Sequence, residues 1–212
     1  DGLRFNTVIF TNLSRDHLDY HKTYKDYFNS KLILFNKLAK KKANLIYDND
    51  IFQSKTLKKI CIKKKLKPLT IGKKNSDLII SKHEYVDNLQ KVEIKFNKKK
   101  YSFTTNLIGK IQVNNLLFSI LAASKSKIKF NKIIQSISHI KPVEGRLESV
   151  GIIRNNSKVI LDYAHTPDAL KYTLESIREQ FNQSSISIVF GCGGDRDKNK
   201  RSIMGKIANQ YC

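Results

Sequence analysis

The feature that most constrains this chain is a short apolar run followed at once by a dense polar one. Residues 7–10 are β-branched or aromatic, which predicts a buried strand. Asn12 and Ser14 end that strand, and a dense polar set follows: Asp16, His17, Asp19 and His21. Polar groups just beyond a strand end lie where open α/β sheets bind their ligands. The sequence therefore predicts an α/β fold with a ligand site at this edge.

A lysine stands on the helix predicted next. From Tyr24 to Leu38 apolar residues recur at three- and four-residue steps, and Lys31 lies on or beside that stripe, four residues after Tyr27. Burying an ammonium is costly. Two interpretations stay open: the side chain buries its stem and extends its charge to water, or the amine is chemically altered or paired, facing the polar cluster at the strand end.

The next segments show mainly strand patterns. Residues 43–47 predict a second strand, and residues 51–67 an exposed, lysine-rich helix with a connector. From Leu69 to Leu107 apolar residues alternate with a period near two, and the break at 96–101 predicts a hairpin. We therefore expect an antiparallel patch in this part of the chain.

Three later segments combine a strand with a polar or glycine-rich turn and a helix. The first ends its strand at Gly109 and runs as a helix to Ala123, followed by a helix around 130–137. The second has Asp162 at a strand end and Thr166-Pro-Asp as a helix start, and the third predicts a strand at 186–190 and a helix through Ile207. Pro142 and Gly145 mark the predicted domain boundary, between residues 142 and 143.

The basic composition bears on whether the chain binds nucleic acid. A net charge of +22 and a pI of about 9.9 are typical of nucleic-acid-binding proteins. Only seven of the 40 basic residues are arginine, however, and arginine is the usual reader of phosphates and base edges. The lysines are scattered along the chain, which favours a solvated surface over a nucleic-acid partner.

Cysteines and apolar runs point to the compartment. The three cysteines (Cys61, Cys192 and Cys212) have no paired spacing, which argues against a disulfide scaffold or zinc site and fits a reducing cytoplasm. No apolar run is long enough to cross a membrane, and no signal-peptide pattern is present. The start at Asp1-Gly-Leu and the end inside a helical pattern suggest an internal piece of a longer chain.

Five segments of the chain carry a family resemblance. They are 11–21 (Thr-Asn-Leu-Ser-Arg-Asp-His-Leu-Asp-Tyr-His) with Lys31, then 107–123, Gly-Arg-Leu-Glu at 145–148, Asp-Tyr-Ala-His-Thr-Pro-Asp at 162–168 and Gly-Cys-Gly-Gly-Asp-Arg-Asp-Lys-Asn-Lys-Arg at 191–201. These segments resemble motifs of the Mur ligases, and more narrowly of the branch that adds the third amino acid to a peptidoglycan precursor. The resemblance implies the second half of a central mononucleotide-binding ATPase domain (1–142) and the start of a Rossmann-like C-terminal domain (143–212).

The reaction that the resemblance implies is ATP-dependent amide formation. ATP phosphorylates the glutamate carboxylate of UDP-N-acetylmuramoyl-L-alanyl-D-glutamate, and the amine of meso-diaminopimelate or another diamino acid displaces the phosphate. The implied cofactors are Mg²⁺ and a CO₂-derived carbamate on Lys31. The carbamylated Lys31 and His17 would be the metal ligands and catalytic residues, since a carbamate is a hard oxygen ligand of the kind that Mg²⁺ prefers.

The same resemblance assigns the other site residues. Asn115, Arg146, Asp162 and His165 would bind ATP, and Arg196 would bind the carboxylate of the incoming amino acid. His165 and Asp168 also have a purely structural interpretation in the helix start, which is favoured for Asp168. Two positions depart from the family pattern, because Gln112 replaces an asparagine and Asn199 a glycine.

The resemblance also sets the expected context. It implies a monomer in the cytoplasm, without nucleic-acid or membrane partners. A Gly-Thr-x-Gly-Lys-Thr phosphate loop and a UDP-sugar domain are missing from these 212 residues, so we expect them to be inactive alone. The alternatives are another Mur-type ligase (lysine-adding, folylpolyglutamate or cyanophycin synthetase) and a basic nucleic-acid-binding module.

Overall fold

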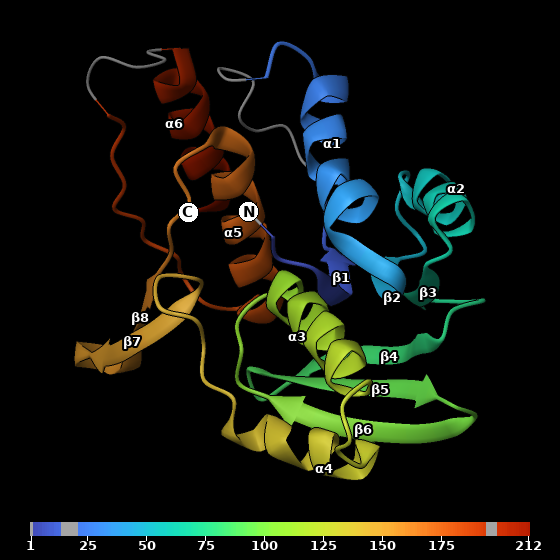
Figure 1. The fold of residues 1–212 in the computed structure, drawn as a ribbon. Coiled ribbons are helices and arrows are strands. Elements are labelled where there is room, and N and C mark those ends of the chain that lie inside the picture. The colour runs from blue at the N-terminus through green and yellow to red at the C-terminus, as the bar shows by residue number, and fades with distance from the viewer. Residues whose placement is uncertain (1, 14–20, 194–198) are drawn as a thin grey trace. The chain divides into compact units, whose positions relative to one another are not determined.

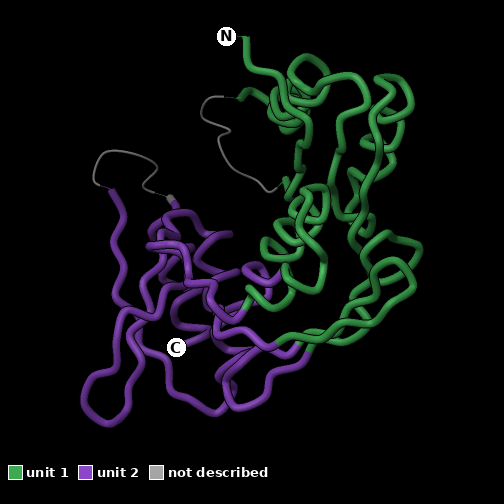
Figure 2. Tube along the Cα trace, turned by 60° about the horizontal axis from the view of Figure 1, so that its bottom comes forward, with its two compact units in different colours: residues 1–83, 92–103, 114–137 green, residues 84–91, 104–113, 138–212 purple. Residues whose placement is uncertain are grey.

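The computed structural model describes residues 2–13, 21–193 and 199–212 (Figure 1). They form two compact units, each with a hydrophobic core (Figure 2). Unit 1 comprises residues 1–83, 92–103 and 114–137, and unit 2 comprises residues 84–91, 104–113 and 138–212. The predicted domain boundary between residues 142 and 143 stays a prediction.

The larger sheet follows the order of the chain. Its strands are neighbours in the order β1 to β6. β1 pairs in parallel with β2, β2 with β3, and β3 with β4. The strands predicted at 7–10 and 43–47 are confirmed as parts of β1 and β2. The six strands are β1 (Phe5–Phe10), β2 (Ala39–Asp48), β3 (Lys67–Gly72), β4 (Leu78–Val86), β5 (Leu89–Phe96) and β6 (Lys99–Thr105).

Two tight turns join the last three strands. Asp87 and Asn88 separate β4 from β5, and Asn97 and Lys98 separate β5 from β6. All four residues have positive φ, between 48° and 64°, as in the type I′ turns that link antiparallel strands. The hairpin predicted at 96–101 is therefore confirmed.

The antiparallel patch is narrower than the alternating pattern predicted. β3, which contains Leu69, is parallel to β2. The reason is the connection, because helix α2 (Ser54–Lys64) lies between the two strands, and a helical crossover returns the chain in the same direction. Alternation alone does not distinguish the two directions of pairing.

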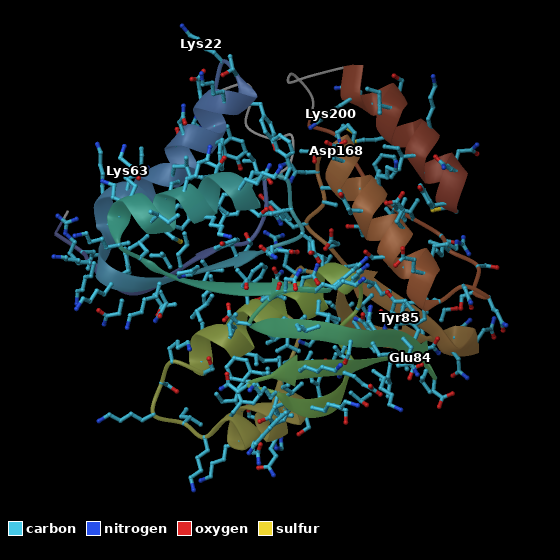
Figure 3. The ribbon with its side chains drawn as sticks, turned by 90° about the vertical axis from the view of Figure 1, so that its right-hand side faces the viewer. Lys22, Lys63, Glu84, Tyr85, Asp168 and Lys200 are labelled. Carbon is cyan, nitrogen blue, oxygen red and sulfur yellow. The ribbon has the colours of Figure 1, made fainter. Side chains whose placement is uncertain are left out.

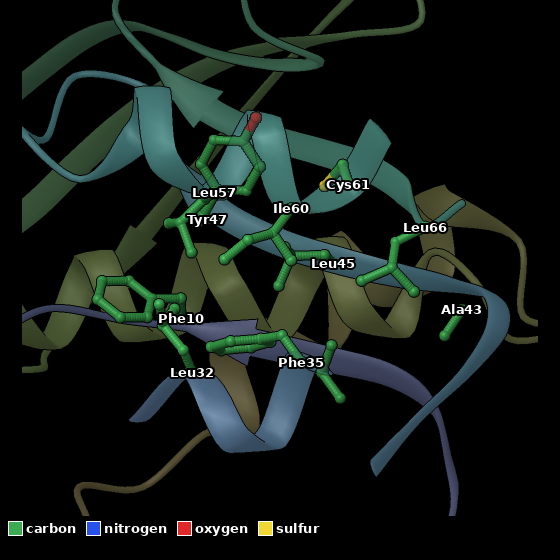
Figure 4. Packing of buried hydrophobic residues seen from close by; sticks show 11 residues of the cluster. Phe10, Leu32, Phe35, Ala43, Leu45, Tyr47, Leu57, Ile60, Cys61 and Leu66 are labelled. Atoms are coloured by element: carbon green, nitrogen blue, oxygen red, sulfur yellow. The ribbon is translucent and has the colours of Figure 1, made fainter. Parts of the chain in front are cut away.

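The helix predicted from Tyr24 to Leu38 is confirmed in two parts. α1 (Tyr24–Ile33) begins after Thr23, whose hydroxyl accepts a hydrogen bond from the Asp26 amide at 3.1 Å. It continues as the π-helical turn η1 (Leu34–Leu38). Its buried residues Leu32 and Phe35 join side chains of β1, β2 and α2 in the core of unit 1 (Figure 4).

Two further helices follow the sheet. α3 (Lys110–Ala123) confirms the helix predicted after Gly109, and Leu117 and Leu121 on it are fully buried. α4 (Phe130–Gln135) continues as the 3₁₀ turn η2 (Ser136–His139). The ring of Phe130 stacks on that of Phe96, with centroids 4.4 Å apart. This contact attaches α4 to β5.

Unit 2 contains a hairpin and two packed helices. β7 (Glu148–Ile153) pairs antiparallel with β8 (Ser157–Leu161) across the 3₁₀ turn η3 (Arg154–Asn156). α5 (Pro167–Gln180) packs on α6 (Asn199–Tyr211) around the buried residues Leu170, Leu174 and Met204. Thr166 caps α5 by accepting from the Ala169 amide, with Pro167 in the first turn, as predicted.

The strand predicted at 186–190 is wrong for this structure. Ile186 and Ile188 pack against the α5–α6 core, but the segment has no strand assignment. Val189 is fully exposed. A strand needs a hydrogen-bonded neighbour, and the sheets that the described residues form do not include this segment.

In the described ranges, no helix combines the length and apolar character that spanning a membrane requires.

Candidate functional site

The candidate site is built on the 143–148 turn (Val-Glu-Gly-Arg-Leu-Glu). Arg146 donates its backbone N–H to the Val143 carbonyl at 3.0 Å, and the Gly145 amide donates to the Glu148 carboxylate at 2.8 Å. Leu147 adopts a left-handed conformation with φ of 46°, although its side chain is buried. Such a backbone costs about 1–3 kcal/mol outside glycine, so the surrounding contacts must hold it.

Asp162 supplies one of these contacts from the residue after β8. Its Oδ2 accepts the Leu147 amide at 2.9 Å. Its Oδ1 accepts the Ala164 amide at 3.0 Å and the Thr173 hydroxyl at 2.8 Å. A carboxylate has about four acceptor positions, so three are used within the protein. Asp162 thus joins the 143–148 turn, the end of β8 and helix α5.

Tyr163 carries an exposed ring beside this carboxylate. The Arg146 guanidinium lies over the ring, 4.7 Å from its centroid, and the His165 imidazole meets it edge-on at 5.2 Å. Lys200, in the first turn of α6 (Figure 3), donates from its ammonium to the His165 carbonyl at 3.3 Å. The Arg146 guanidinium over this exposed ring can attract an anionic ligand such as a phosphate.

Gln112 reaches the same turn from the first turn of α3. Its side-chain amide donates to the Arg146 carbonyl at 2.8 Å. Gly109, just before α3, is held by two buried glutamines. Its backbone N–H donates to the Gln180 side-chain oxygen at 2.9 Å, and the Gln90 side-chain nitrogen donates to its carbonyl at 3.2 Å. Gln90 and Gln180 are buried, so this start of α3 is fixed inside unit 2.

The structure brings together three of the residues predicted to bind ATP. Arg146, Asp162 and His165 form one group around Tyr163 in unit 2. Asn115 is exposed on the part of α3 that belongs to unit 1. His17 and Arg196 lie outside the described residues.

Lys31 lies within the described residues, whereas its predicted metal-binding partner His17 does not. Lys31 is half-buried on α1, one residue before the buried Leu32, and its ammonium lies 4.9 Å from the ring centroid of Tyr27. The His21 ring stacks on Tyr27 at 5.1 Å. Within the described ranges, no group of three or more His, Cys, Asp or Glu side chains is placed to hold a metal ion.

Sequence reasoning missed three contributors to this site. Tyr163 lies within a quoted motif, and its place between Asp162 and His165 was the available signal. Thr173 offered none, because its partner is 11 residues away in the chain. Gln112 stood out as a departure from a family motif, but its bond to the Arg146 carbonyl, 34 residues away, was not predictable. Contacts at that separation follow from tertiary packing.

Comparison with known proteins identifies both parts of the chain. Residues 1–123 match the family model of the Mur ligase middle domain, and residues 145–212 that of the Mur ligase glutamate ligase domain. A UDP-N-acetylmuramoyl-L-alanyl-D-glutamate--2,6-diaminopimelate ligase from Rickettsia montanensis is 37% identical over 97% of this chain. The alignment covers 42% of that relative, so the chain spans less than half of its length.

Solved structures agree with this assignment. The structure of a UDP-N-acetylmuramoyl-L-alanyl-D-glutamate--2,6-diaminopimelate ligase is similar with a TM-score of 0.69 and 27% identity, over 97% of this chain and 42% of that one. A MurF ligase from Thermotoga maritima in complex with ADP has the same fold, with a TM-score of 0.67 and 16% identity over 83% of this chain and 40% of its own. The chain belongs to the Mur ligase family.

Proposed function

We propose that this chain is part of the ATP-dependent ligase that adds meso-diaminopimelate to UDP-N-acetylmuramoyl-L-alanyl-D-glutamate. Support comes from the relative of that name, which is 37% identical over nearly the whole chain. The reaction forms an acyl phosphate on the glutamate carboxylate, which the amine of the diamino acid then attacks. Catalysis of this kind depends mainly on positioning and charge neutralisation.

The observation that carries the proposal is the link between Asp162 and the backbone of Leu147. It joins two segments, Gly-Arg-Leu-Glu and Asp-Tyr-Ala-His, that the family resemblance assigns to the same nucleotide. The Arg146 guanidinium lies over the Tyr163 ring, and the Lys200 ammonium donates to the His165 carbonyl. A guanidinium suits a polyphosphate, which arginine can bind through two parallel hydrogen bonds.

Each residue has a proposed task. Arg146 binds ATP phosphates, and Asp162 offers its remaining acceptor position to a ribose hydroxyl while it holds the 143–148 turn. His165 contributes beside Tyr163, and Asn115 contacts the adenine. Arg196 binds the carboxylate of the incoming amino acid through a two-pronged hydrogen bond.

The metal assignment rests on the chemistry of two side chains. His17 and a carbamylated Lys31 would hold Mg²⁺, which neutralises phosphate charge when it is bound. His17 lies outside the described residues, and the Lys31 ammonium lies 4.9 Å from the Tyr27 ring centroid. The carbamate would turn this cation into the oxygen ligand that the metal requires.

The proposal is tested with the full-length protein. We expect ATP hydrolysis to ADP coupled to the joining of meso-diaminopimelate, and much weaker joining of L-lysine, to UDP-N-acetylmuramoyl-L-alanyl-D-glutamate. Asp162→Ala should raise the KM for ATP more than the KM for the amino acid, whereas Asp168→Ala, an exposed aspartate nearby, should change neither. Preferential use of L-lysine, or a change confined to the amino-acid KM, would contradict the proposal.

A further inference from the structure

We infer that Gln112 is a positioning residue that holds Arg146 for nucleotide binding. This inference rests on the proposed function, in which Arg146 contacts the ATP phosphates. The structure gives Gln112 a direct link to the arginine's backbone, because its side-chain nitrogen lies 2.8 Å from the Arg146 carbonyl oxygen. A carbonyl only accepts hydrogen bonds, so the –NH₂ end of the glutamine must face it.

The peptide group between Arg146 and Leu147 is held on both sides. Its carbonyl accepts from Gln112, and its N–H donates to Asp162 at 2.9 Å. Because a peptide group is planar, two such bonds fix its rotation as one unit. That rotation sets both the ψ of Arg146 and the φ of Leu147.

This restraint is needed because the backbone is strained. Leu147 has a φ of 46°, which a branched side chain rarely adopts. Rotating the 146–147 peptide would relieve that strain and would redirect the chain at Arg146. Gln112 therefore opposes a change that would move the guanidinium from the Tyr163 ring, over which it now lies.

Gln112 is itself well anchored. Its backbone N–H donates to the Gly109 carbonyl at 3.1 Å. The backbone N–H of Gly109 in turn donates to the side-chain oxygen of the buried Gln180. The start of α3 thus holds Gln112 beside the 143–148 turn within unit 2.

The test uses the full-length enzyme and three variants. Gln112→Leu removes the amide at similar size, and Gln112→Asn shortens the arm by one methylene. Gln183→Leu is the control, since Gln183 is exposed in the loop after α5. We expect Gln112→Leu to weaken binding of a non-hydrolysable ATP analogue about 2- to 10-fold, Gln112→Asn to be intermediate, and the control to match wild type.

Two further measurements separate positioning from general stability. Amide exchange at Leu147, without nucleotide, should accelerate in Gln112→Leu at an unchanged melting temperature. In an Arg146→Ala background, Gln112→Leu should cause no further loss of affinity for the analogue, since the glutamine acts through the arginine. Equal losses in both backgrounds, or unchanged exchange at Leu147, would overturn the inference. If Arg146→Ala alone leaves affinity unchanged, the proposed role of Arg146 fails, while the exchange measurement still decides whether Gln112 holds the peptide.

Discussion

The Arg146 guanidinium lies over the Tyr163 ring, 4.7 Å from its centroid, and both side chains are exposed. Cation–π contacts at exposed sites contribute about 0.5–1 kcal/mol. Replacing Tyr163 by leucine should therefore weaken ADP binding to the full-length protein about 2- to 5-fold by calorimetric titration, because the arginine loses its platform.

Tyr163→Phe keeps the ring and should bind ADP almost as well as wild type. Tyr172→Leu is the matched control, since Tyr172 is a similarly exposed tyrosine on α5. Should Tyr163→Phe lose as much affinity as Tyr163→Leu, the phenol hydroxyl rather than the ring would be the important group.

Local chemistry made several elements predictable from the sequence. The cap at Thr166 with Pro167 was predictable because each residue suits its position without distant partners. The turn at Asn97 and Lys98 lies between two alternating runs, which is a local signal for a hairpin. The turn at Asn155 and Asn156 lies between apolar runs in the same way, yet the β7–β8 hairpin was not predicted.

Other features depend on partners distant in the sequence. Residues 186–190 have the composition of a strand, but strand formation depends on a neighbour, and two of their side chains pack on helices instead. Asp162 was correctly placed at a strand end. Its bond to Leu147 was not predictable, because it depends on how the 143–148 turn folds back on β8.

Gly109 should not tolerate a side chain. Its φ is +82°, and a Cβ would lie 2.8 Å from Leu147 Cδ1 and 2.9 Å from Ser176 Cβ. Gly109→Ala should cost at least about 1–2 kcal/mol for the left-handed backbone, with the clash in addition. A lower melting temperature of the full-length protein is the expected result.

Gly205 provides the matched control for that substitution. It lies inside α6, and a Cβ there would meet nothing within 4 Å. Gly205→Ala should raise stability by about 0.4–1 kcal/mol, because alanine restricts the unfolded chain and favours a helix. Similar effects of the two substitutions would show that close packing at Gly109 is not the cause.

Cys61 should make unit 1 sensitive to alkaline pH. Burial raises the pKa of its thiol from 9.0 to about 11. Since the unfolded chain then ionises first, the stability that the neutral thiol contributes is complete below pH 9 and is lost as the pH rises towards 11. The loss is on the order of 2 kcal/mol.

Thermal unfolding between pH 8 and pH 10.5 checks this effect. Cys61→Ala should lower the melting temperature at pH 8 but should show a smaller further decrease at pH 10.5 than wild type. Leu57→Ala removes a buried, non-ionising side chain from the same core, so it should keep the full alkaline decrease. Identical pH dependence in Cys61→Ala and wild type would exclude the thiol as the source.

The proposed carbamate on Lys31 can be tested directly. The Lys31 ammonium now lies 4.9 Å from the Tyr27 ring centroid, an arrangement that suits a cation. Carbamylation requires the neutral amine, so the ammonium first loses a proton. The amine nitrogen then bonds to CO₂ and releases a second proton, which leaves an anion. Since the face of an aromatic ring carries negative charge, we expect the carbamylated arm to leave Tyr27 and to turn towards a metal ion.

If Lys31 carries a carbamate, substitutions at this position should affect the activity of the full-length enzyme in a specific way. Lys31→Ala should lose activity, and small carboxylic acids that occupy the vacated space should partly restore it. Lys31→Glu should restore little because its arm is shorter, and Lys25→Ala, an exposed lysine on the same helix, should remain active. Removing bicarbonate from the assay should lower wild-type activity reversibly. A crystal structure of the active, metal-loaded enzyme with an unmodified amine at Lys31 would rule the carbamate out.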